Sequence, residues 1–155
     1  MPWTARVVAY TDRAAQVLIA ELDEDMIARY GGGDETSVLP DQFTPPHGTF
    51  VVVCDEAGLI GCAGLRATDE VDVGDVELKR MYVRSTRRRE GHAARLMTVL
   101  EDHSREHGFS RIILETGSPQ AEATAFYERC GFELIANFGY YKADSRSRCY
   151  AKRLD

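Results

Sequence analysis

A strand that passes through a basic, glycine-containing turn into a helix constrains this chain more than any other feature. Residues 76–83 read as a strand, and residues 91–107 carry apolar side chains at helical spacing. Residues 112–114 then form a wholly apolar run, which is typical of a strand buried on both faces of a sheet. This succession predicts an α/β fold in which a helix packs against a largely buried sheet.

The rest of the sequence supplies strands before this unit and a helix and strands after it. Strands are expected over 6–10, 50–54, 59–65, 132–136 and 147–153. A first helix, capped by Thr11 or Asp12, runs to the glycines at 31–33, and a proline-containing loop follows over 34–48. A last helix begins at Ser118 and Pro119 and ends at Gly131. The order β-α-β-β-β-α-β-α-β-β predicts a mixed sheet covered on both faces.

Composition narrows the class of protein. The 155 residues, 44% of them hydrophobic, suit a single domain over 1–155. The net charge of −6 argues against nucleic-acid binding through a basic field. No apolar run approaches the roughly 20 residues of a membrane span, and the N-terminus lacks secretory-signal features, so a cytoplasmic location is expected.

The cysteines and histidines give no indication of a metal site. The four cysteines stand at 54, 62, 130 and 149, without a CxxC pair and without histidines at zinc-ligand spacing. We therefore expect reduced, structural cysteines and no bound metal.

The turn before the second helix has the properties of a phosphate site. It reads Arg88-Arg89-Glu90-Gly91-His92-Ala93. A helix N-terminus exposes unpaired amides and partial positive charge, and small residues at 91 and 93 let a phosphate approach those amides closely. Arginines 87–89 add positive charge. The alternative is a basic turn that only begins a helix.

Three segments together resemble the GCN5-related N-acetyltransferase (GNAT) superfamily. They are 76–83 followed by 88–93, the strand Ile112-Ile113-Leu114-Glu115, and Ala125-Phe126-Tyr127-Glu128-Arg129-Cys130-Gly131-Phe132, which is similar to the family's "FYxxxGF" segment. The resemblance covers residues 50–153 well and the N-terminal part in layout. Three departures are Ala93 for a commoner glycine, His92 for an apolar residue, and Gln120 for a commoner asparagine.

The resemblance implies a fold, a cofactor and a reaction. It implies a mixed sheet of about six or seven strands with a V-shaped splay, flanked by about four helices. Acetyl-CoA is the implied co-substrate, with its pantetheine arm against the backbone of Met81, Tyr82 and Val83. Backbone amides from Arg89 to Ala94 would hold the pyrophosphate, and Gln120 would lie near the pantetheine. The implied reaction is direct attack of an amine on the thioester.

Two residues are candidates for proton transfer. Glu77 stands eleven positions before Arg88, the offset of the glutamate base in the family's histone-acetylating branch. Lys79 could instead pair with Glu77, or a water chain could end at another carboxylate such as Glu115. Tyr127 matches the family's general acid near the CoA sulfur, although it could equally be a core tyrosine.

The acceptor site is expected after the penultimate strand. Phe138, Tyr140 and Glu115 are its candidate lining, although the aromatic residues could instead pack a loop or a dimer interface. The acceptor could be a small polyamine, an amino acid, an antibiotic or a protein amine, and family members often dimerise. The alternative function is a non-catalytic acyl-CoA-binding sensor; a ligand-free interaction domain fits the motifs less well.

Overall fold

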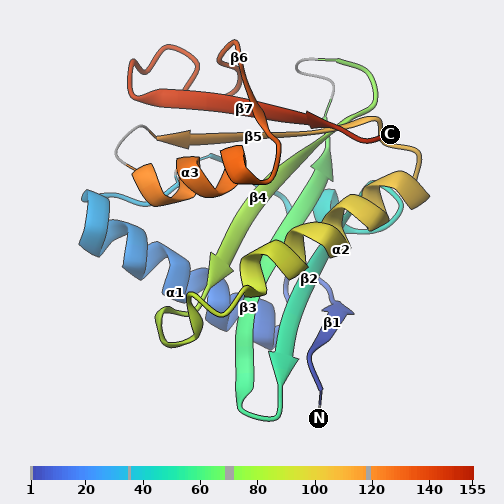
Figure 1. Cartoon of the computed structure of the whole chain (residues 1–155), viewed down its shortest axis with the longest axis vertical. Coiled ribbons are helices and arrows are strands. Elements are labelled where there is room, and N and C mark those ends of the chain that lie inside the picture. Colours follow the sequence, from blue (N-terminus) through green and yellow to red (C-terminus); the bar gives the residue numbers. More distant parts are fainter. Residues whose placement is uncertain (1, 35, 69–71, 118–119) are drawn as a thin grey trace.

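A seven-stranded sheet forms the centre of the molecule (Figure 1). The computed structural model describes residues 2–34, 36–68, 72–117 and 120–155. The strand order across the sheet is β1-β2-β3-β4-β5-β7-β6. The strands are β1 (Thr4–Val7), β2 (Gly48–Asp55), β3 (Gly58–Ala67), β4 (Asp75–Val83), β5 (Arg111–Gly117), β6 (Glu133–Ile135) and β7 (Ser147–Arg153). The predicted order of strands and helices along the chain is confirmed.

Three α-helices flank the sheet in the described residues, one fewer than expected. They are α1 (Arg13–Tyr30), α2 (His92–Glu106) and α3 (Ala121–Arg129), with short 3-10 turns η1 (Pro40–Phe43) and η2 (Ser85–Arg87). The predicted cap of α1 is confirmed, because the Asp12 carboxylate accepts from the Ala14 amide at 3.0 Å. Gly31 ends this helix with a φ of 85°. The predicted cap at Ser118 and Pro119 lies outside the described residues.

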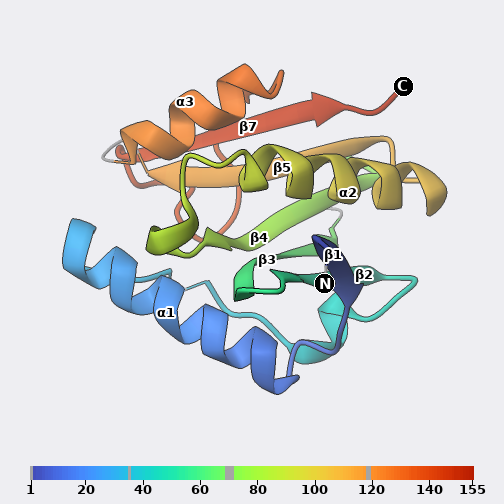
Figure 2. The ribbon, with the colours of Figure 1, turned by 60° about the horizontal axis from the view of Figure 1, so that its bottom comes forward.

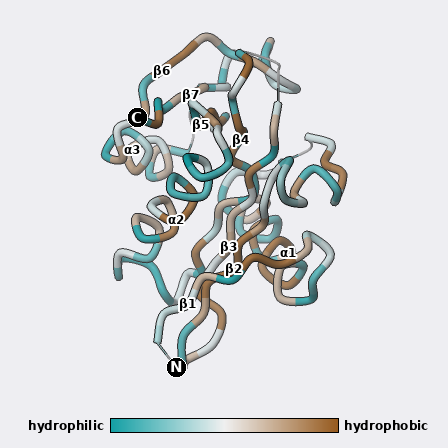
Figure 3. Tube along the Cα trace, turned by 90° about the vertical axis from the view of Figure 1, so that its right-hand side faces the viewer, coloured by the Kyte–Doolittle hydropathy of each residue, from teal (hydrophilic) through white to brown (hydrophobic). Residues whose placement is uncertain are grey.

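The helices cover the two faces of the sheet unequally (Figure 2). Helices α2 and α3 lie on one face, over a core that extends from Val51 through Leu65 and Leu100 to Leu114. Helix α1 lies on the other face, against β2, β3 and β4. Beside α1, this second face continues over β5 and β7 as a small cluster of Ile113, Phe138, Cys149 and Ala151. Figure 3 shows the apolar character of the chain concentrated in the sheet.

Strands β4 and β5 are parallel neighbours that part soon after they meet. Their register contains three residue pairs, Asp75–Glu77 of β4 against Arg111–Ile113 of β5. Beyond that point β4 continues to Val83 and β5 to Gly117 without pairing to one another. Figure 1 shows the two strands diverging from a common end. The V-shaped splay is therefore present, and it leaves one backbone edge of β4 unpaired with β5.

Smaller expectations were partly right. The first strand begins at Thr4 and ends at Val7, before the predicted 6–10, because the chain must turn toward Asp12. All four cysteines are free, and Cys54, Cys62 and Cys149 are buried as expected. Among the described helices, none combines the length and the apolar character needed to traverse a lipid bilayer.

Candidate active site

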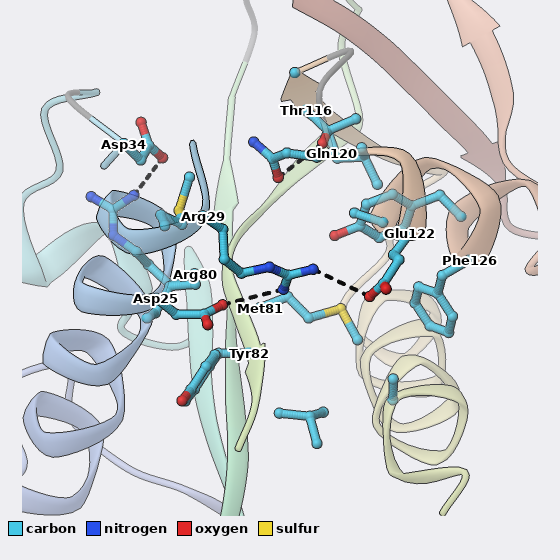
Figure 4. A pocket seen from close by; sticks show the side chains of 18 of the residues that line it. Asp25, Arg29, Asp34, Arg80, Met81, Tyr82, Thr116, Gln120, Glu122 and Phe126 are labelled. Carbon is cyan, nitrogen blue, oxygen red and sulfur yellow. Dashed lines mark hydrogen bonds and ion pairs between the residues drawn. The ribbon is translucent and has the colours of Figure 1, made fainter. Parts of the chain in front are cut away.

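A large cleft opens where β4 and β5 part. It has a volume of about 1380 Å³ and is lined by the C-terminal half of α1, the end of β4, the turn before α2, β5 and α3. Figure 4 shows Met81 of β4 at its floor, between Arg29 of α1 and Phe126 of α3. Of the predicted cofactor residues, all but Glu90 line this cleft, namely Met81, Tyr82, Val83, Arg88, Arg89, Gly91, His92, Ala93, Ala94, Gln120 and Tyr127.

The turn before α2 has the backbone of an anion site. Arg89 and Gly91 both adopt left-handed conformations, with φ of 64° and 85°. Alternating conformations of this kind direct successive amides into one concavity. Gly91 precedes the first residue of α2, and no side chain caps this helix N-terminus. The amides of the first turn are therefore available to a ligand, which supports the phosphate interpretation over a turn that only begins a helix.

The three arginines of this turn are not equivalent. Arg87 pairs with Asp55 on the β2–β3 turn and with Glu90. Arg88 donates to the Val83 carbonyl at 2.9 Å and reaches Asp25 of α1 at 3.3 Å. Arg89 makes no hydrogen bond or ion pair with any described residue. It is therefore the arginine of the three whose charge is left for a ligand.

His92 and Glu90 are connected to the N-terminal segment. The Trp3 indole donates to His92 Nδ1 at 3.1 Å, and His92 Nε2 lies 2.8 Å from the Glu90 carboxylate. The hydrogen bond from His92 lowers the pKa of Glu90 below its usual value. The side chains of Glu90 and His92 are therefore hydrogen-bonded to one another.

Tyr82 takes a different position from its neighbours on β4. Its ring packs with the α1-side core, and its hydroxyl lies 3.4 Å from Glu21 of α1. The side chains of Met81 and Val83 pack instead on the α2 side. A cofactor in the cleft could therefore use the backbone of Tyr82 rather than its ring.

Tyr127 lines the cleft from the inner face of α3. Its ring lies against Phe126 and Phe132, with centroids 5.4 and 5.8 Å away. Burial raises the pKa of this phenol above its usual value, so the hydroxyl keeps its proton at neutral pH. The hydroxyl makes no hydrogen bond with another described residue. Tyr127 is thus a packed aromatic residue of the cleft lining whose phenol keeps its proton.

A second, smaller cavity adjoins the cleft on the α1 side of the sheet. It has a volume of about 380 Å³. It is surrounded by the loop after α1, by residues of the strands β3, β4 and β5, and by the segment after β6. Its lining includes Glu77, Glu115, Phe138 and Tyr140, which the sequence analysis placed in the catalytic or acceptor site. Glu115 is shared by the linings of both cavities.

Glu77 forms an ion pair, as the alternative to a base role considered, but its partner is not Lys79. Glu77 accepts from Arg66 Nε at 2.9 Å, because these residues are cross-strand neighbours in the β3–β4 register. Lys79 instead contacts Asp34 at 2.7 Å. Glu77 is therefore a neutralised carboxylate, while it still lines the small cavity.

Glu115 has a different environment. It accepts a hydrogen bond from the Ser147 hydroxyl at 2.9 Å, and it forms no salt bridge with a described residue. Burial raises the pKa of this carboxyl above its usual value. A carboxylate with a raised pKa that lines two cavities has the properties of a proton acceptor.

The two aromatic candidates for the acceptor site lie in different parts of the small cavity, Phe138 in its wall and Tyr140 at its rim. Phe138 is buried against Ile113, Cys149 and Ala151, so it packs the loop and walls the cavity at once. Tyr140 is 64% exposed and stacks edge to face on Tyr141, 4.8 Å away. The two possibilities considered for this segment, packing and pocket formation, are combined in Phe138.

Sequence reasoning missed several polar residues around the cleft. Arg29 of α1 bridges Asp25 and Glu122, joining α1 to α3 across the cleft, as Figure 4 shows. Asp34, beyond α1, contacts both Lys79 and Arg80 of β4. Apart from Asp25, one helical turn before Arg29, their partners lie 45 to 93 positions away in sequence, so no local pattern could have identified them. Among the described residues, no cluster of potential metal ligands exists.

Together, a splayed sheet, an uncapped helix N-terminus and a cleft that meets a second cavity define an α/β protein built to hold an extended, phosphate-bearing ligand. The sequence model of the acetyltransferase (GNAT) family matches residues 15–132. The chain belongs to this family.

Individual relatives agree with this assignment. An IAA acetyltransferase of Azospirillum brasilense is 32% identical over 137 residues, 88% of each chain. A protein of Klebsiella pneumoniae assigned to the acyl-CoA N-acyltransferases has a crystal structure with a TM-score of 0.80, 28% identity and coverage of 99% and 98%. The PaiA N-acetyltransferase of Thermoplasma acidophilum, solved with coenzyme A, shares the fold at a TM-score of 0.75, 16% identity and 99% coverage of each chain.

Proposed function

We propose that this protein is an N-acetyltransferase that moves the acetyl group of acetyl-CoA directly to an amine. The observation that carries the proposal is that Glu115 lines two cavities, one beside an uncapped helix N-terminus and one lined in part by polar loops. A thioester in the first cavity and an amine in the second would meet there. The proposed activity belongs to one domain over residues 1–155, with a cytoplasmic location.

The residues of the cleft suit acetyl-CoA. The amides from Arg89 to Ala94 and the free guanidinium of Arg89 would hold the pyrophosphate. The unpaired edge of β4 around Met81 and Val83 would bind the pantetheine amides as an added strand would. Gln120, whose side-chain oxygen accepts from Thr116 at 3.2 Å, lies on the opposite wall. No metal is required by this arrangement.

Proton removal from the amine is assigned to Glu115. An ammonium has no lone pair, so the acceptor must lose a proton before or during attack. Arg66 donates to the Glu77 carboxylate at 2.9 Å and so occupies one of its oxygens. Glu115 forms no salt bridge with a described residue, and burial raises its pKa, so it is assigned as the base. Glu77 would then help to orient the amine through its place in the small cavity.

Tyr127 is assigned to the leaving thiolate. Its phenol keeps its proton, and its pKa lies above that of an ordinary thiol, near 8.5. Complete transfer to a thiolate is therefore uphill, and donation of a hydrogen bond is the favoured contribution. The bond would strengthen as negative charge develops on sulfur, which stabilises the transition state over the ground state.

The small cavity indicates a broad class of acceptor rather than a single molecule. A cavity of about 380 Å³ with two carboxylates suits a small cationic amine or the end of a peptide. The exposed Tyr140 at the rim could contact the remainder of such a molecule. A polyamine, an amino acid, an amine-bearing antibiotic and a protein amine are all candidates, and a homodimer would leave them unchanged.

An acceptor screen with a free-thiol readout tests the proposal. Calorimetry should first give a micromolar dissociation constant for acetyl-CoA, and thiol release should then appear with one class of amine. Tyr127→Phe should lower turnover by roughly tenfold or more while the dissociation constant stays the same. Tyr10→Phe, a ring outside both cavities, is the matched control.

The results separate the possible functions. Absence of heat and of competition would reject binding of acetyl-CoA altogether. Binding without thiol release, across all acceptor classes, would favour the alternative of an acyl-CoA sensor. Equal turnover in wild type and Tyr127→Phe would remove Tyr127 from the chemistry.

A further inference from the structure

Asp34 holds two buried cations of β4 in place. Its Oδ2 atom accepts from Lys79 Nζ at 2.7 Å and from Arg80 Nη1 at 2.6 Å. The two basic side chains are 6% and 8% exposed, and Asp34 is 20% exposed. Its other oxygen accepts from the Thr36 amide at 2.9 Å. This carboxylate therefore neutralises cations that would be costly to bury alone, and the loop after α1 holds it there.

The strand segment that Asp34 grips is irregular. Cys62 pairs with Tyr82 and Gly64 with Lys79, so the single residue Ala63 of β3 faces two residues of β4, Arg80 and Met81. Arg80 adopts a left-handed φ of 59°, a conformation that costs energy for any residue other than glycine. This is a β-bulge, and such features redirect the backbone near active sites.

The bulge also fixes the direction of one amide. The Cys62 thiol donates to the Arg80 carbonyl at 3.3 Å, and burial raises the pKa of this thiol to about 12, so it remains a donor. The peptide between Arg80 and Met81 is trans, which directs the Met81 N–H opposite to that carbonyl. The amide thus points away from Cys62. Met81 itself lines the cleft.

We propose that Asp34 is a positioning residue for catalysis. Through Arg80 it holds the left-handed bulge of β4, so that the Met81 amide keeps the direction in which it would donate to the oxygen of a thioester bound in the cleft. The inference rests on the proposed acetyl transfer. It adds a role for Asp34, which lines the same cleft, that is exerted through Arg80. Arg80 also donates to the Thr36 carbonyl at 3.4 Å, but without the carboxylate its left-handed backbone relaxes and the amide turns away.

Variants of both partners test this role. Asp34→Asn should lower kcat by roughly tenfold to a hundredfold, less than the 10²–10³ typical of deleting an oxyanion donor, because the amide is displaced rather than lost. The dissociation constant for acetyl-CoA should change by less than about threefold, and Asp34→Glu should recover part of the rate. Glu101→Gln, which breaks an ion pair with Lys152 away from the cleft, should keep the wild-type kcat.

Arg80→Gly separates alignment from folding. Glycine adopts a left-handed conformation without strain, so this variant should keep kcat within about threefold of wild type. In the Arg80→Gly background, Asp34→Asn should cost about threefold or less. An equal loss from Asp34→Asn in both backgrounds would overturn the inference, as would loss of activity in Arg80→Gly with acetyl-CoA still bound.

A readout without turnover separates this inference from the proposed function. The Met81 amide resonance of the acetyl-CoA complex should shift in Asp34→Asn and return toward its wild-type position in Asp34→Glu. An unchanged resonance in Asp34→Asn would overturn the positioning role even if the wild type transfers acetyl groups. Absence of thiol release by the wild type, by contrast, would reject the proposed acetyl transfer. The Met81 resonance would then still test whether Asp34 sets the direction of this amide.

Discussion

At the scale of single residues, neighbours rather than residue types distinguish the two carboxylates of the small cavity. Glu77 faces the guanidinium of Arg66 across two paired strands. Among the described residues, Glu115 accepts a hydrogen bond from the Ser147 hydroxyl and forms no salt bridge, in a half-buried site. Burial raises the pKa of Glu115, and the nearby charge of Lys79 offsets only part of this effect. The same chemical group is therefore structural at one position and suited to proton transfer at the other.

The pH dependence of Glu115→Gln tests this distinction. A base must be ionised to act, so wild-type activity should rise with pH through the raised pKa of Glu115, above its ordinary value of 4.5. The variant should lack this rise and lose roughly 10²- to 10⁴-fold in rate, the usual contribution of a general base. The measurement is kcat/KM from pH 5 to 9. Glu77→Gln is the matched control and should keep the rise; the opposite assignment would be indicated if it alone lost it.

The free energy of unfolding should depend on pH in the opposite sense to the activity. A carboxyl whose pKa is raised on folding stabilises the native state below its ordinary pKa and loses that contribution as the pH rises through the native value. At neutral pH the ionised Glu115 is thus a cost to folding. Glu115→Gln should unfold at an equal or higher urea concentration than wild type, although it is less active.

At the scale of elements, the site depends on where strands and helices begin and end. Helix α2 begins at the open end of the splay because β4 ends at Val83 and the chain turns back through the left-handed Arg89 and Gly91. The N-terminus of the helix thereby meets the cleft, and its dipole favours the phosphates there. Helix α3 places Tyr127 on the other wall. Neither helix needs to bury a charged side chain to do so.

Gly91→Ala tests the contribution of the turn. An added Cβ would meet no atom within 4 Å, so the change acts through the backbone, at a φ of 85° that costs an L-residue about 1–2 kcal/mol. The free turn should relax to another conformation, and acetyl-CoA affinity should fall roughly tenfold, the factor that corresponds to about 1.4 kcal/mol. Isothermal titration calorimetry measures this change.

Gly108→Ala is a close control at the other end of the same helix. Gly108 also has a left-handed φ, 78°, and equally open surroundings. It should show a comparable loss of stability with unchanged affinity for acetyl-CoA. A similar fall in affinity for both variants would mean that general destabilisation, rather than the anion site, controls binding.

At the scale of the whole molecule, the sheet consists of two parts joined at a short seam. Strands β1 to β4 and strands β5 to β7 meet through three residue pairs. At this closed end Arg111 forms two hydrogen bonds to Asp75, at 2.9 and 2.8 Å, and the Asp75 side chain is 1% exposed. The cleft exists because the pairing stops there, so one buried ion pair anchors the splay.

Asp75→Ala should therefore be strongly destabilising. Removing Asp75 leaves Arg111 with Asp72 as a remaining carboxylate, at 3.2 Å and 67% exposed, so we expect a cost of about 3 kcal/mol, the lower end for a broken buried pair. Urea unfolding measures the loss, with Asp144→Asn, from an exposed pair with Arg146, as a control expected to change little. The double variant Asp75→Leu with Arg111→Met should recover most of the stability lost in Asp75→Ala. If the double variant is as unstable as Asp75→Ala, the ion pair itself, and not the uncompensated charge, holds the two parts of the sheet together.

Features that depend on residues close together in the sequence could be predicted, and features that depend on distant residues could not. Every strand and helix was expected near its observed place, because hydrophobic spacing and caps such as Asp12 act within a few residues. The 88–93 turn was also identified locally. The ion-pair partner of Glu77 was not predicted. Arg66 reaches Glu77 through the pairing of β3 with β4, which a short stretch of sequence does not reveal. Asp34 carried no signal at all, because its partners lie 45 and 46 positions further on.

The sequence by itself determined the order of elements, the position of the phosphate turn and the set of residues from which a site could be built, since these depend on neighbours along the chain. The tertiary structure decided which carboxylate is neutralised, which arginine is left for a ligand and where the bulge in β4 is held. Those outcomes depend on burial and on charges brought together from distant segments. Their energies arise only when the sheet and the loop after α1 have assembled.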